Sequence, residues 1–338
     1  MKKRIAINGF GRVGRLVFRQ MLEQDGYEMV AINDLAPPDM LAYLLKFDSA
    51  QETFRHADAV SHDENTLEVA GKSVAVFREQ DASKLPWGDL GIDLVMECSG
   101  AYTSSQKSQA HINVGAGRVI ISSSAGTDIP TIVFGVNEQV LKAKDVIISA
   151  ASCSTNCLAP MVKALNDYAP VLSGYMNTIH GYTATQKIVD SVHPKGNFRR
   201  ARAAAVNIVP TVAQAAEAVG LVLPKLRGKL FGCAHRVPVP AGCCIVFTAV
   251  VQRKDVTVEA VNAAFLTATN EVLGYTEEFV VSSDIIGITY GALFDATQTK
   301  ASKINDELHQ VQIVSWFDNE NSYASQMVRT AEYLLSLS

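Results

Sequence analysis

The chain has 338 residues, of which 48% are hydrophobic and 19% charged, and its formal net charge at pH 7 is −4. This composition is typical of a globular protein of about two domains, and the slight negative charge gives no reason to expect nucleic acid or an anionic membrane as a partner. The longest apolar run, residues 243–251, is too short to span a bilayer, so no membrane partner is expected.

The N-terminus and the cysteines both favour a cytoplasmic protein. Residues 1–4 run directly into a predicted strand and leave no room for a signal peptide. The six cysteines form no C-x-x-C pair and no His/Cys cluster with the spacing of metal ligands. We therefore expect reduced thiols and no metal site, with Cys98, Cys233, Cys243 and Cys244 as inert core residues.

Residues 4–34 are predicted to form a strand, a glycine turn, a helix and a second strand. The turn has the pattern G-x-G-x-x-G from Gly9 to Gly14, and the second strand ends in Asp34, twenty residues after Gly14. Within such a unit this pattern is a strong indication of a dinucleotide site. The first part of the chain, residues 1–152, is therefore predicted to be an α/β Rossmann domain with a doubly wound parallel sheet.

Each residue of the turn has a physical role toward a dinucleotide. Gly9 permits the tight turn, Gly11 lets the backbone approach the pyrophosphate, and Gly14 lets the helix pack closely against the strand. The helix N-terminus, which includes Arg12 and Val13, offers N–H donors to the phosphates.

Further strand ends supply the rest of the predicted cofactor site. Asp34 can accept hydrogen bonds from both hydroxyls of the adenosine ribose and repel a 2′-phosphate, which favours NAD over NADP. The short apolar runs that precede Ser99 and Ser122 suit a parallel sheet covered on both faces. Ligands of such sheets gather at the carboxyl ends of the strands, so we expect Ser99, Gly100 and Ser122 to contact the cofactor.

A cysteine stands where another predicted strand, residues 146–149, passes into a predicted helix over residues 152–166. Cys153 would lie in the first helical turn, facing unpaired N–H groups and the positive end of the helix dipole. That environment favours the thiolate, which is the nucleophilic form. The alternative is a small buried core residue, as most free cysteines are. The position at the cofactor edge of the sheet favours the nucleophile.

Residues 153–318 show longer runs that indicate an α+β catalytic domain with a largely antiparallel sheet and flanking helices. One predicted strand, residues 174–179, places His180 at its end, and residues 244–251 form another. Residues 319–338 are predicted to form a helix whose apolar face packs back onto the first domain.

Four motifs resemble those of the glyceraldehyde-3-phosphate dehydrogenase family. They are Ala-Ser-Cys-Ser-Thr-Asn-Cys at residues 151–157, His-Gly-Tyr-Thr-Ala-Thr-Gln at 180–186, Arg-Val-Pro at 236–238 and Trp-Phe-Asp-Asn-Glu at 316–320. The resemblance covers essentially the whole chain, within a superfamily that also includes erythrose-4-phosphate dehydrogenase. It implies oxidation of glyceraldehyde 3-phosphate with NAD and inorganic phosphate to 1,3-bisphosphoglycerate, in a cytoplasmic homotetramer.

The resemblance also implies the roles of three residues. Cys153 attacks the aldehyde to give a thiohemiacetal, and its backbone N–H stabilises the oxyanion. His180 pairs with the thiolate and takes the hydroxyl proton as hydride leaves. Asn319 matches the family residue that orients the nicotinamide carboxamide.

Two anion sites are expected from the same resemblance. Thr183, Thr185 and Arg236 match the residues that bind the substrate phosphate, with hydroxyl and guanidinium donors suited to its oxygens. Ser152 and Ser154 match the residues that bind the attacking inorganic phosphate.

The chain departs from the family pattern at Ala213 and Gln214. The family usually has a Thr-Gly pair there that helps to hold the attacking phosphate, so one hydroxyl donor is missing. This leaves open an enzyme that hydrolyses its thioester with water, or one that acts on erythrose 4-phosphate. A family member kept only as a binding protein is a further alternative, which the intact catalytic motifs disfavour.

A second departure lies in the loop over residues 191–202, which aligns with the family loop that reaches a neighbouring subunit's cofactor site. Ser191 and Val192 replace a Leu-Pro pair associated with strict NAD use, which leaves open some tolerance of NADP. The arginines at residues 199–202 are interpreted as an intersubunit or solvated face.

Overall fold

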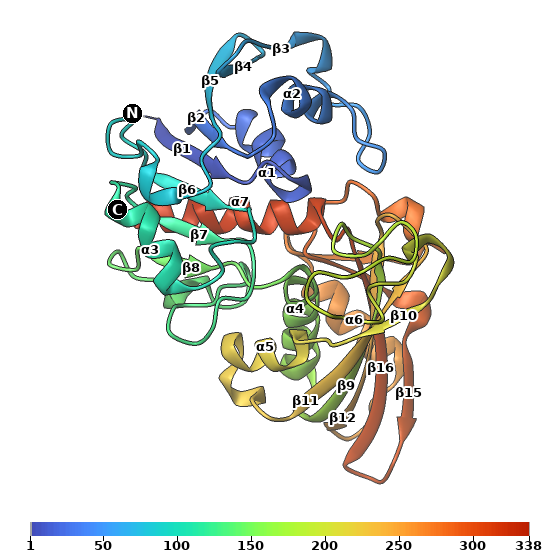
Figure 1. Ribbon diagram of the computed structural model, residues 1–338. Coiled ribbons are helices and arrows are strands. Elements are labelled where there is room, and N and C mark those ends of the chain that lie inside the picture. The colour runs from blue at the N-terminus through green and yellow to red at the C-terminus, as the bar shows by residue number, and fades with distance from the viewer. Residues whose placement is uncertain (1, 338) are drawn as a thin grey trace. The chain divides into compact units, whose positions relative to one another are not determined.

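A computed structural model describes residues 2–337 of the chain (Figure 1). The described chain divides into two compact units. Unit 1 comprises the residues up to 134, residues 138–152 and the residues from 324 onward, and unit 2 comprises residues 135–137 and 153–323.

The described part of unit 1 is built on an eight-stranded sheet with the order β3-β4-β5-β2-β1-β6-β7-β8. Strands β5, β2, β1, β6, β7 and β8 run parallel to one another, which confirms the predicted parallel sheet. Strands β3 and β4 extend its edge as antiparallel strands, which the sequence analysis did not predict. The strands are β1 Lys3–Asn8, β2 Tyr27–Asn33, β3 Val60–His62, β4 Thr66–Val69, β5 Lys72–Phe77, β6 Leu94–Glu97, β7 Val119–Ile121 and β8 Ile147–Ser149.

Helices pack against this sheet through their apolar faces. Helix α1 buries Leu16, Val17 and Met21 at helical spacing. The end of α7 is held by Arg118, which donates hydrogen bonds to the carbonyl oxygens of Leu334 and Ala143. The helices with residues in unit 1 are α1 Arg12–Leu22, α2 Pro38–Lys46, α3 Ser105–Asn113 and α7 Asn321–Ser336 (red in Figure 1).

Unit 2 contains a mixed sheet with the order β10-β11-β9-β12-β16-β14-β13, and β15 pairs with β16. Strand β9 is parallel to β11 and β13 is parallel to β14, while the other pairs are antiparallel. The strands are β9 Val171–Gly181, β10 Val209–Thr211, β11 Leu230–Val237, β12 Cys243–Gln252, β13 Leu273–Thr276, β14 Ala292–Asp295, β15 Lys300–Lys303 and β16 Leu308–Phe317.

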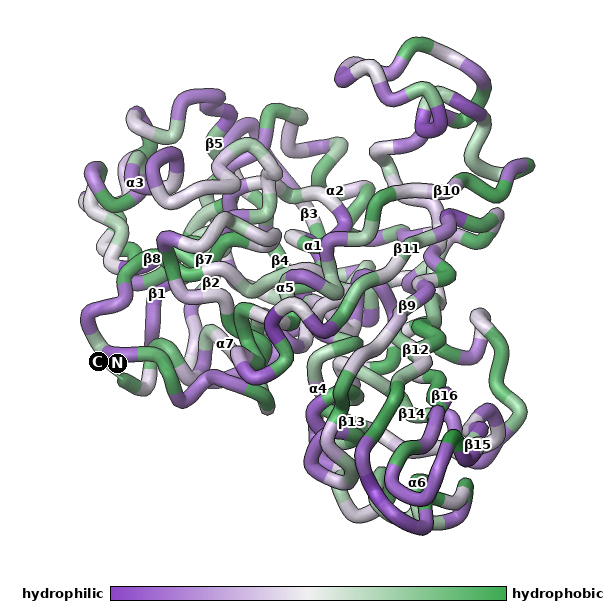
Figure 2. Tube along the Cα trace, turned by 90° about the horizontal axis from the view of Figure 1, so that it is seen from below, coloured by the Kyte–Doolittle hydropathy of each residue, from purple (hydrophilic) through white to green (hydrophobic). Residues whose placement is uncertain are grey.

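The core of unit 2 forms on one face of this sheet. In the central strand β12 every second residue from Cys243 to Val251 is buried, and from Ile245 onward the residues between them are only half-buried, as the two-residue period of a strand requires. Figure 2 shows apolar stretches running through the strands and many of the hydrophilic ones in connecting segments. The helices of unit 2 are α4 Cys153–Tyr168, α5 Ala215–Val222 and α6 Val258–Thr267.

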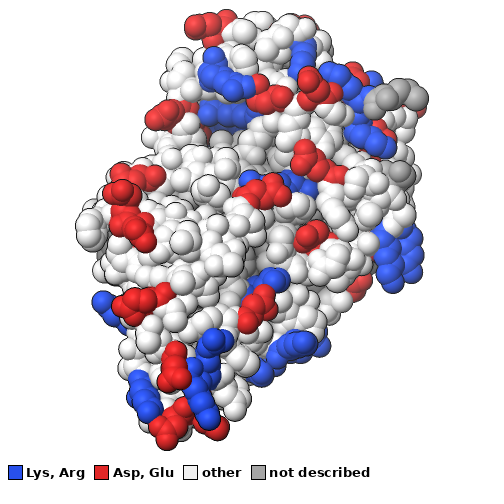
Figure 3. Space-filling view, turned by 180° about the vertical axis from the view of Figure 1, so that it is seen from behind, with Lys and Arg blue, Asp and Glu red and all other residues white. Residues whose placement is uncertain are grey.

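Short 3-10 helices complete the described elements. They are η1 Ala57–Ala59, η2 Ala82–Lys84, η3 Glu138–Val140, η4 Ala204–Val206, η5 Pro224–Leu226, η6 Ser282–Ile285 and η7 Ala296–Gln298. On the face in Figure 3, basic and acidic side chains are interspersed. Within residues 2–337, no helix has the length and apolar character to cross a membrane, and no cluster of three or more His, Cys, Asp or Glu could hold a metal ion.

Candidate functional site

The glycine turn after β1 leaves room for a ligand at one position and none at the other two. Gly9 has φ +91°, and a Cβ there would lie 2.4 Å from Cα of Ser99. A Cβ on Gly14 would lie 2.1 Å from the carbonyl oxygen of Gly9, so helix and turn touch backbone to backbone. A Cβ on Gly11 would meet no protein atom within 4 Å. The open space at Gly11 fits the close approach of a pyrophosphate to the backbone.

Asp34 braces this turn from the end of β2. Its Oδ2 accepts a hydrogen bond from the N–H of Phe10 at 2.7 Å, and its Oδ1 accepts one from the N–H of Ala36 at 3.0 Å. Each carboxylate oxygen keeps further lone-pair capacity, because an ionised carboxylate offers about four acceptor positions. Asp34 can therefore hold the turn and still accept from ribose hydroxyls.

A cavity of about 380 Å³ opens at the carboxyl ends of β1, β2 and β6. It brings together Gly9, Gly11, Asp34 and Ser99 of the predicted cofactor residues, whereas Arg12, Val13, Gly14, Gly100 and Ser122 do not line it. Cys98, expected as an inert core residue, lies in its wall. Sequence analysis missed the other lining residues, which are Asn8, Asn33, Leu35, Glu79, Gln80, Ala101 and Tyr102.

In unit 2, Cys153 and His180 face each other at 3.5 Å between Sγ and Nε2. Cys153 lies in the first turn of helix α4, as predicted, and is its first residue, and His180 is the next-to-last residue of β9. The ring of His180 is buried, with its edge against the ring of Phe317 at 5.8 Å between centroids. A strand end and a helix start thus place a thiol within hydrogen-bond reach of an imidazole.

The charge state of this pair differs from the sequence expectation. Burial raises the pKa of the Cys153 thiol, and this outweighs the opposite effects of the Arg236 charge and of hydrogen bonds from Ser154. Burial and then the Arg236 charge lower the pKa of His180 to about 3. At neutral pH both groups are therefore uncharged. For Cys153, the loss of hydration destabilises the thiolate more than the start of the helix stabilises it.

Two hydrogen bonds compete for Nδ1 of His180. Nη1 of Arg236 lies 2.6 Å from Nδ1, and the carbonyl oxygen of Gly181 lies 2.8 Å from it. A bond from Arg236 requires an unprotonated Nδ1, whereas a bond to Gly181 requires the proton on Nδ1. Only the second arrangement leaves Nε2 free to accept the proton of Cys153.

A cluster of hydroxyl and guanidinium groups lies at the end of the same sheet. Thr183 and Thr185 are joined at 2.9 Å between their Oγ1 atoms, and Arg200 donates to Thr185 at 2.9 Å and to Thr211 at 3.2 Å. The Nε–H of Arg236 is buried with no hydrogen-bond partner in the described residues. Such a set of donors suits an anion.

The sequence and its relatives identify the family. Residues 3–105 match the family model "Glyceraldehyde 3-phosphate dehydrogenase, NAD binding domain", and residues 152–319 match the C-terminal domain of the same family. The chain belongs to the glyceraldehyde-3-phosphate dehydrogenase family. The resemblance found in the sequence is thereby confirmed.

Curated members of the family match over almost the whole chain. The glyceraldehyde-3-phosphate dehydrogenase of Clostridium pasteurianum is 52% identical over 334 residues, and that of Clostridium acetobutylicum is 51% identical, each over 99% of both chains. The enzyme of Streptococcus pyogenes serotype M1 is 46% identical over 338 residues, which are 100% of this chain and 99% of the relative. The chain is therefore an NAD-dependent dehydrogenase, and its glycine turn, Asp34 and cavity lie in the matched NAD-binding domain.

Within this glyceraldehyde-3-phosphate dehydrogenase family member, the remaining predicted residues lie as follows. Ser154 hydrogen-bonds to Cys153, and Ser152 is the last residue of its segment of unit 1. Asn319 is buried, and its Oδ1 accepts a hydrogen bond from the thiol of Cys243 at 3.2 Å. Gln214 is the N-cap residue of α5, but its side chain makes no capping bond.

Arg200 is the functional candidate that sequence analysis missed in unit 2. Its cluster of arginines was visible at residues 199–202, and we interpreted it as an intersubunit or solvated face. The signal that separates Arg200 from its neighbours is spatial, because the loop returns its guanidinium to Thr185 and Thr211.

Proposed function

We propose that the chain oxidises glyceraldehyde 3-phosphate with NAD and inorganic phosphate to 1,3-bisphosphoglycerate, as a glycolytic enzyme. The observation that carries the proposal is the contact of Cys153 Sγ with His180 Nε2 beside a cluster of anion-binding donors. A nucleophile, its base and a phosphate site are the groups that a phosphorylated aldehyde requires.

Binding of the substrate phosphate prepares the base. Phosphate oxygens accept from Thr183, Thr185 and Arg236, and the guanidinium turns from Nδ1 of His180 toward the anion. His180 then donates from Nδ1 to the carbonyl oxygen of Gly181 and accepts the thiol proton at Nε2. The base is thus assembled only when a phosphorylated substrate is present.

The chain's own groups then carry the covalent chemistry. The sulfur of Cys153 forms a bond to the aldehyde carbon, and the backbone N–H of Cys153 stabilises the oxyanion. His180 returns the thiol proton to this oxyanion to form the thiohemiacetal hydroxyl, and takes it back as a hydride leaves the same carbon, so that a thioester remains on Cys153. NAD, when bound, supplies the hydride acceptor, and Asn319 is proposed to orient its carboxamide.

Attack of inorganic phosphate on the thioester closes the reaction. Ser152 and Ser154 are proposed to hold this phosphate, and Arg200 is a further donor in unit 2. The alternatives, hydrolysis by water or use of erythrose 4-phosphate, rest on Ala213 and Gln214. They are not favoured, because relatives of about 50% identity over the full length carry the name glyceraldehyde-3-phosphate dehydrogenase.

A cytoplasmic homotetramer is part of the proposal. The loop that follows His180 carries apolar side chains that face solvent in the single chain: Ile188 is 91%, Val192 88% and Phe198 89% exposed. Large exposed apolar groups close together in a chain mark a surface that is covered by a partner. A second copy of this chain is the partner that the family resemblance implies.

The deciding experiment measures NADH formation from glyceraldehyde 3-phosphate and NAD while inorganic phosphate is raised from none to saturation. A rate that rises with phosphate and saturates supports the phosphorylating enzyme. A rate independent of phosphate contradicts it and indicates hydrolysis, and erythrose 4-phosphate is then the substrate to compare.

A further inference from the structure

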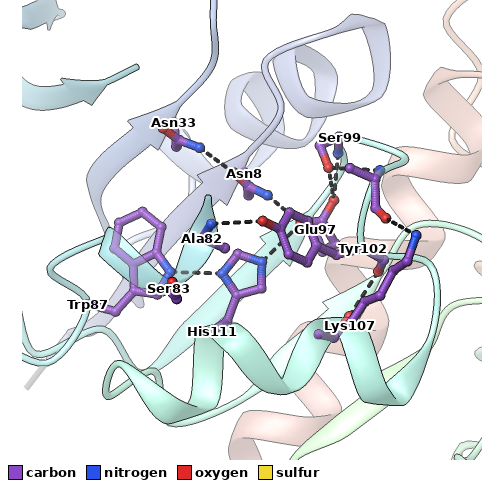
Figure 4. Close-up of polar contacts among 12 residues, drawn as sticks. Asn8, Asn33, Ala82, Ser83, Trp87, Glu97, Ser99, Tyr102, Lys107 and His111 are labelled. Carbon is purple, nitrogen blue, oxygen red and sulfur yellow. Dashed lines mark hydrogen bonds and ion pairs between the residues drawn. The ribbon is translucent and has the colours of Figure 1, made fainter. Parts of the chain in front are cut away.

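Glu97, the last residue of β6, is a buried carboxylate that accepts four hydrogen bonds (Figure 4). Its Oε2 accepts from Nδ2 of Asn8 at 2.5 Å and from Nε2 of His111 at 3.1 Å. Its Oε1 accepts from the backbone N–H of Ser99 at 2.8 Å and from the hydroxyl of Ser99 at 2.5 Å. Four donors on two oxygens is the full capacity of an ionised carboxylate.

The proton on His111 is fixed by Trp87. Nε1 of Trp87, which can only donate, lies 3.0 Å from Nδ1 of His111, so Nδ1 is the acceptor and Nε2 carries the hydrogen. The imidazole is therefore neutral, and it donates to Glu97. Both rings are fully buried and stack at 6.4 Å between centroids. Trp87 and His111 form a fixed donor behind the carboxylate.

The negative charge of Glu97 is thus held by neutral donors. In the described part of the chain no lysine or arginine forms an ion pair with Glu97. The nearest group that could carry a positive charge is the imidazole of His111, and it is neutral. Burial of a carboxylate without a cation is costly. A glutamine at this position would cost less free energy to bury than the charged carboxylate. Its NH2 group, however, would face the donors that now bind Glu97.

The groups that Glu97 holds belong to the walls of the cofactor cavity. Asn8 precedes Gly9 at the end of β1, and its Oδ1 accepts from Nδ2 of Asn33 at 2.7 Å. Asn33 in turn holds the backbone of Glu79, donating to its carbonyl oxygen and accepting from its N–H, each at 2.9 Å. The ends of β6, β1 and β2 and the segment after β5 are therefore tied to one carboxylate. Neither Glu97 nor His111 lines the cavity.

Glu97 also decides what Ser99 can offer a ligand. The hydroxyl of Ser99 gives its hydrogen to Glu97 and accepts from the N–H of Ala101 at 3.1 Å. Its remaining capacity is one lone pair, so toward a ligand Ser99 can act only as an acceptor.

We propose that Glu97 is a positioning residue for the cofactor: its ionised carboxylate holds the strand ends of the cavity in the geometry that accepts NAD. Trp87 and His111 keep the donor beneath it in one tautomer. The inference rests on NAD binding by unit 1 and goes beyond it, because it assigns a function to residues that do not touch the ligand.

The test is the Glu97→Gln variant of the full-length protein. We expect the Kd of NADH and the KM for NAD to rise about tenfold, because at least one of four buried donors loses its acceptor. The kcat at saturating NAD and the KM for glyceraldehyde 3-phosphate stay within about twofold of wild type, since their residues lie in unit 2. Fluorescence titration of NADH and steady-state kinetics give the two sets of values.

Two further variants control for a general loss of structure. In the single variant His111→Gln the amide can still accept from Trp87 and donate to Glu97. We therefore expect its NADH affinity to stay within about twofold of wild type. Glu28→Gln removes an exposed carboxylate on β2 that pairs with Arg4, and it is expected to change neither constant. A folded Glu97→Gln protein whose NADH affinity is unchanged overturns the proposal, as does a rise of both substrate KM values together.

If Glu97→Gln does not fold, Trp87→Phe carries the test. It removes the donor to Nδ1 from outside the cavity, so His111 can shift its proton away from Glu97, and NADH binding is expected to weaken about threefold. Unchanged NADH affinity in a folded Trp87→Phe protein overturns the proposal. Because NADH binding needs no turnover, a protein that fails to oxidise the aldehyde would overturn the proposed function alone.

Discussion

The polar groups of the two units are arranged on opposite principles. At the cofactor cavity of unit 1, the carboxylate of Glu97 has a donor for each lone pair, and the tautomer of His111 is fixed. At the Cys153–His180 pair of unit 2, Nδ1 of His180 has two competing partners, and Nε–H of Arg236 has none among residues 2–337.

This difference teaches how each site uses its ligand. A network in which all donors and acceptors are paired is rigid, so unit 1 is ready for its cofactor before the cofactor arrives. We expect the unpaired and competing groups of unit 2 to find their partners only when an anion is present. On this interpretation unit 1 is preorganised by the protein, and unit 2 is completed by the substrate.

The largest expected effect is a loss of turnover in unit 2 that leaves cofactor binding in unit 1 unchanged. Cys153→Ser removes the nucleophile, and we expect kcat to fall by at least about 10³-fold while the Kd of NADH stays within about twofold. Steady-state kinetics and NADH titration measure the two quantities. The matched control is Cys157→Ser, four residues along the same helix, whose buried thiol donates to the carbonyl oxygen of Ser315 at 4.0 Å. If Cys157→Ser is as inactive as Cys153→Ser, the assignment of the nucleophile is wrong.

Arg236 tests whether the substrate completes the catalytic pair. In Arg236→Gln we expect the KM for glyceraldehyde 3-phosphate to rise about 100-fold, because charge-assisted bonds to the phosphate are lost. Oxidation of unphosphorylated glyceraldehyde should be unchanged or faster, because the competing donor no longer occupies Nδ1 of His180. Arg227→Gln, an exposed arginine of the same unit, serves as the control. An equal loss with both aldehydes would show that Arg236 does not discriminate by phosphate.

The binding of inorganic phosphate in unit 2 can be strengthened instead of removed. The double variant Ala213→Thr with Gln214→Gly restores the usual Thr-Gly pair, and we expect the KM for inorganic phosphate to fall about tenfold through one added charge-assisted bond. The KM for NAD should not change, since the substitution lies outside unit 1. Titrations of NADH formation with phosphate and with NAD measure the two constants. An unchanged KM for phosphate would mean that Gln214 already replaces the missing hydroxyl.

Local patterns in the sequence were sufficient for much of the fold. The glycine turn, the strands around it and the start of α4 at Cys153 follow from spacing along a continuous segment, and the structure places them within a few residues of their predicted bounds. The edge strands β3 and β4 were not predicted, because they lack the continuous apolar run that marks the comparably short β7 and β8.

Contacts across the fold set the limit of prediction. The link from Trp87 through His111 to Glu97 joins residues whose proximity depends on how a loop, a helix and a strand pack, and no spacing signals it. The position of Arg200 depends on the course of a long loop. The thiol of Cys153 was expected to ionise from its place in the helix, but burial by distant residues decides its pKa in the opposite direction.

The smallest expected effect concerns pH, and it tests whether His180 is held neutral. Its pKa is lowered to about 3 in the folded chain, against about 6.5 in an unfolded chain. Between these values the unfolded state binds a proton that the folded state does not, so this contribution to stability is complete above about pH 6.5 and is lost as the pH falls toward 3. His180→Gln removes it, and we expect the free energy of unfolding to fall less steeply below pH 6.5, by on the order of 1 kcal/mol per pH unit. Urea unfolding at several pH values measures the slope. An unchanged slope in His180→Gln would mean that the imidazole of His180 is not buried in the neutral form.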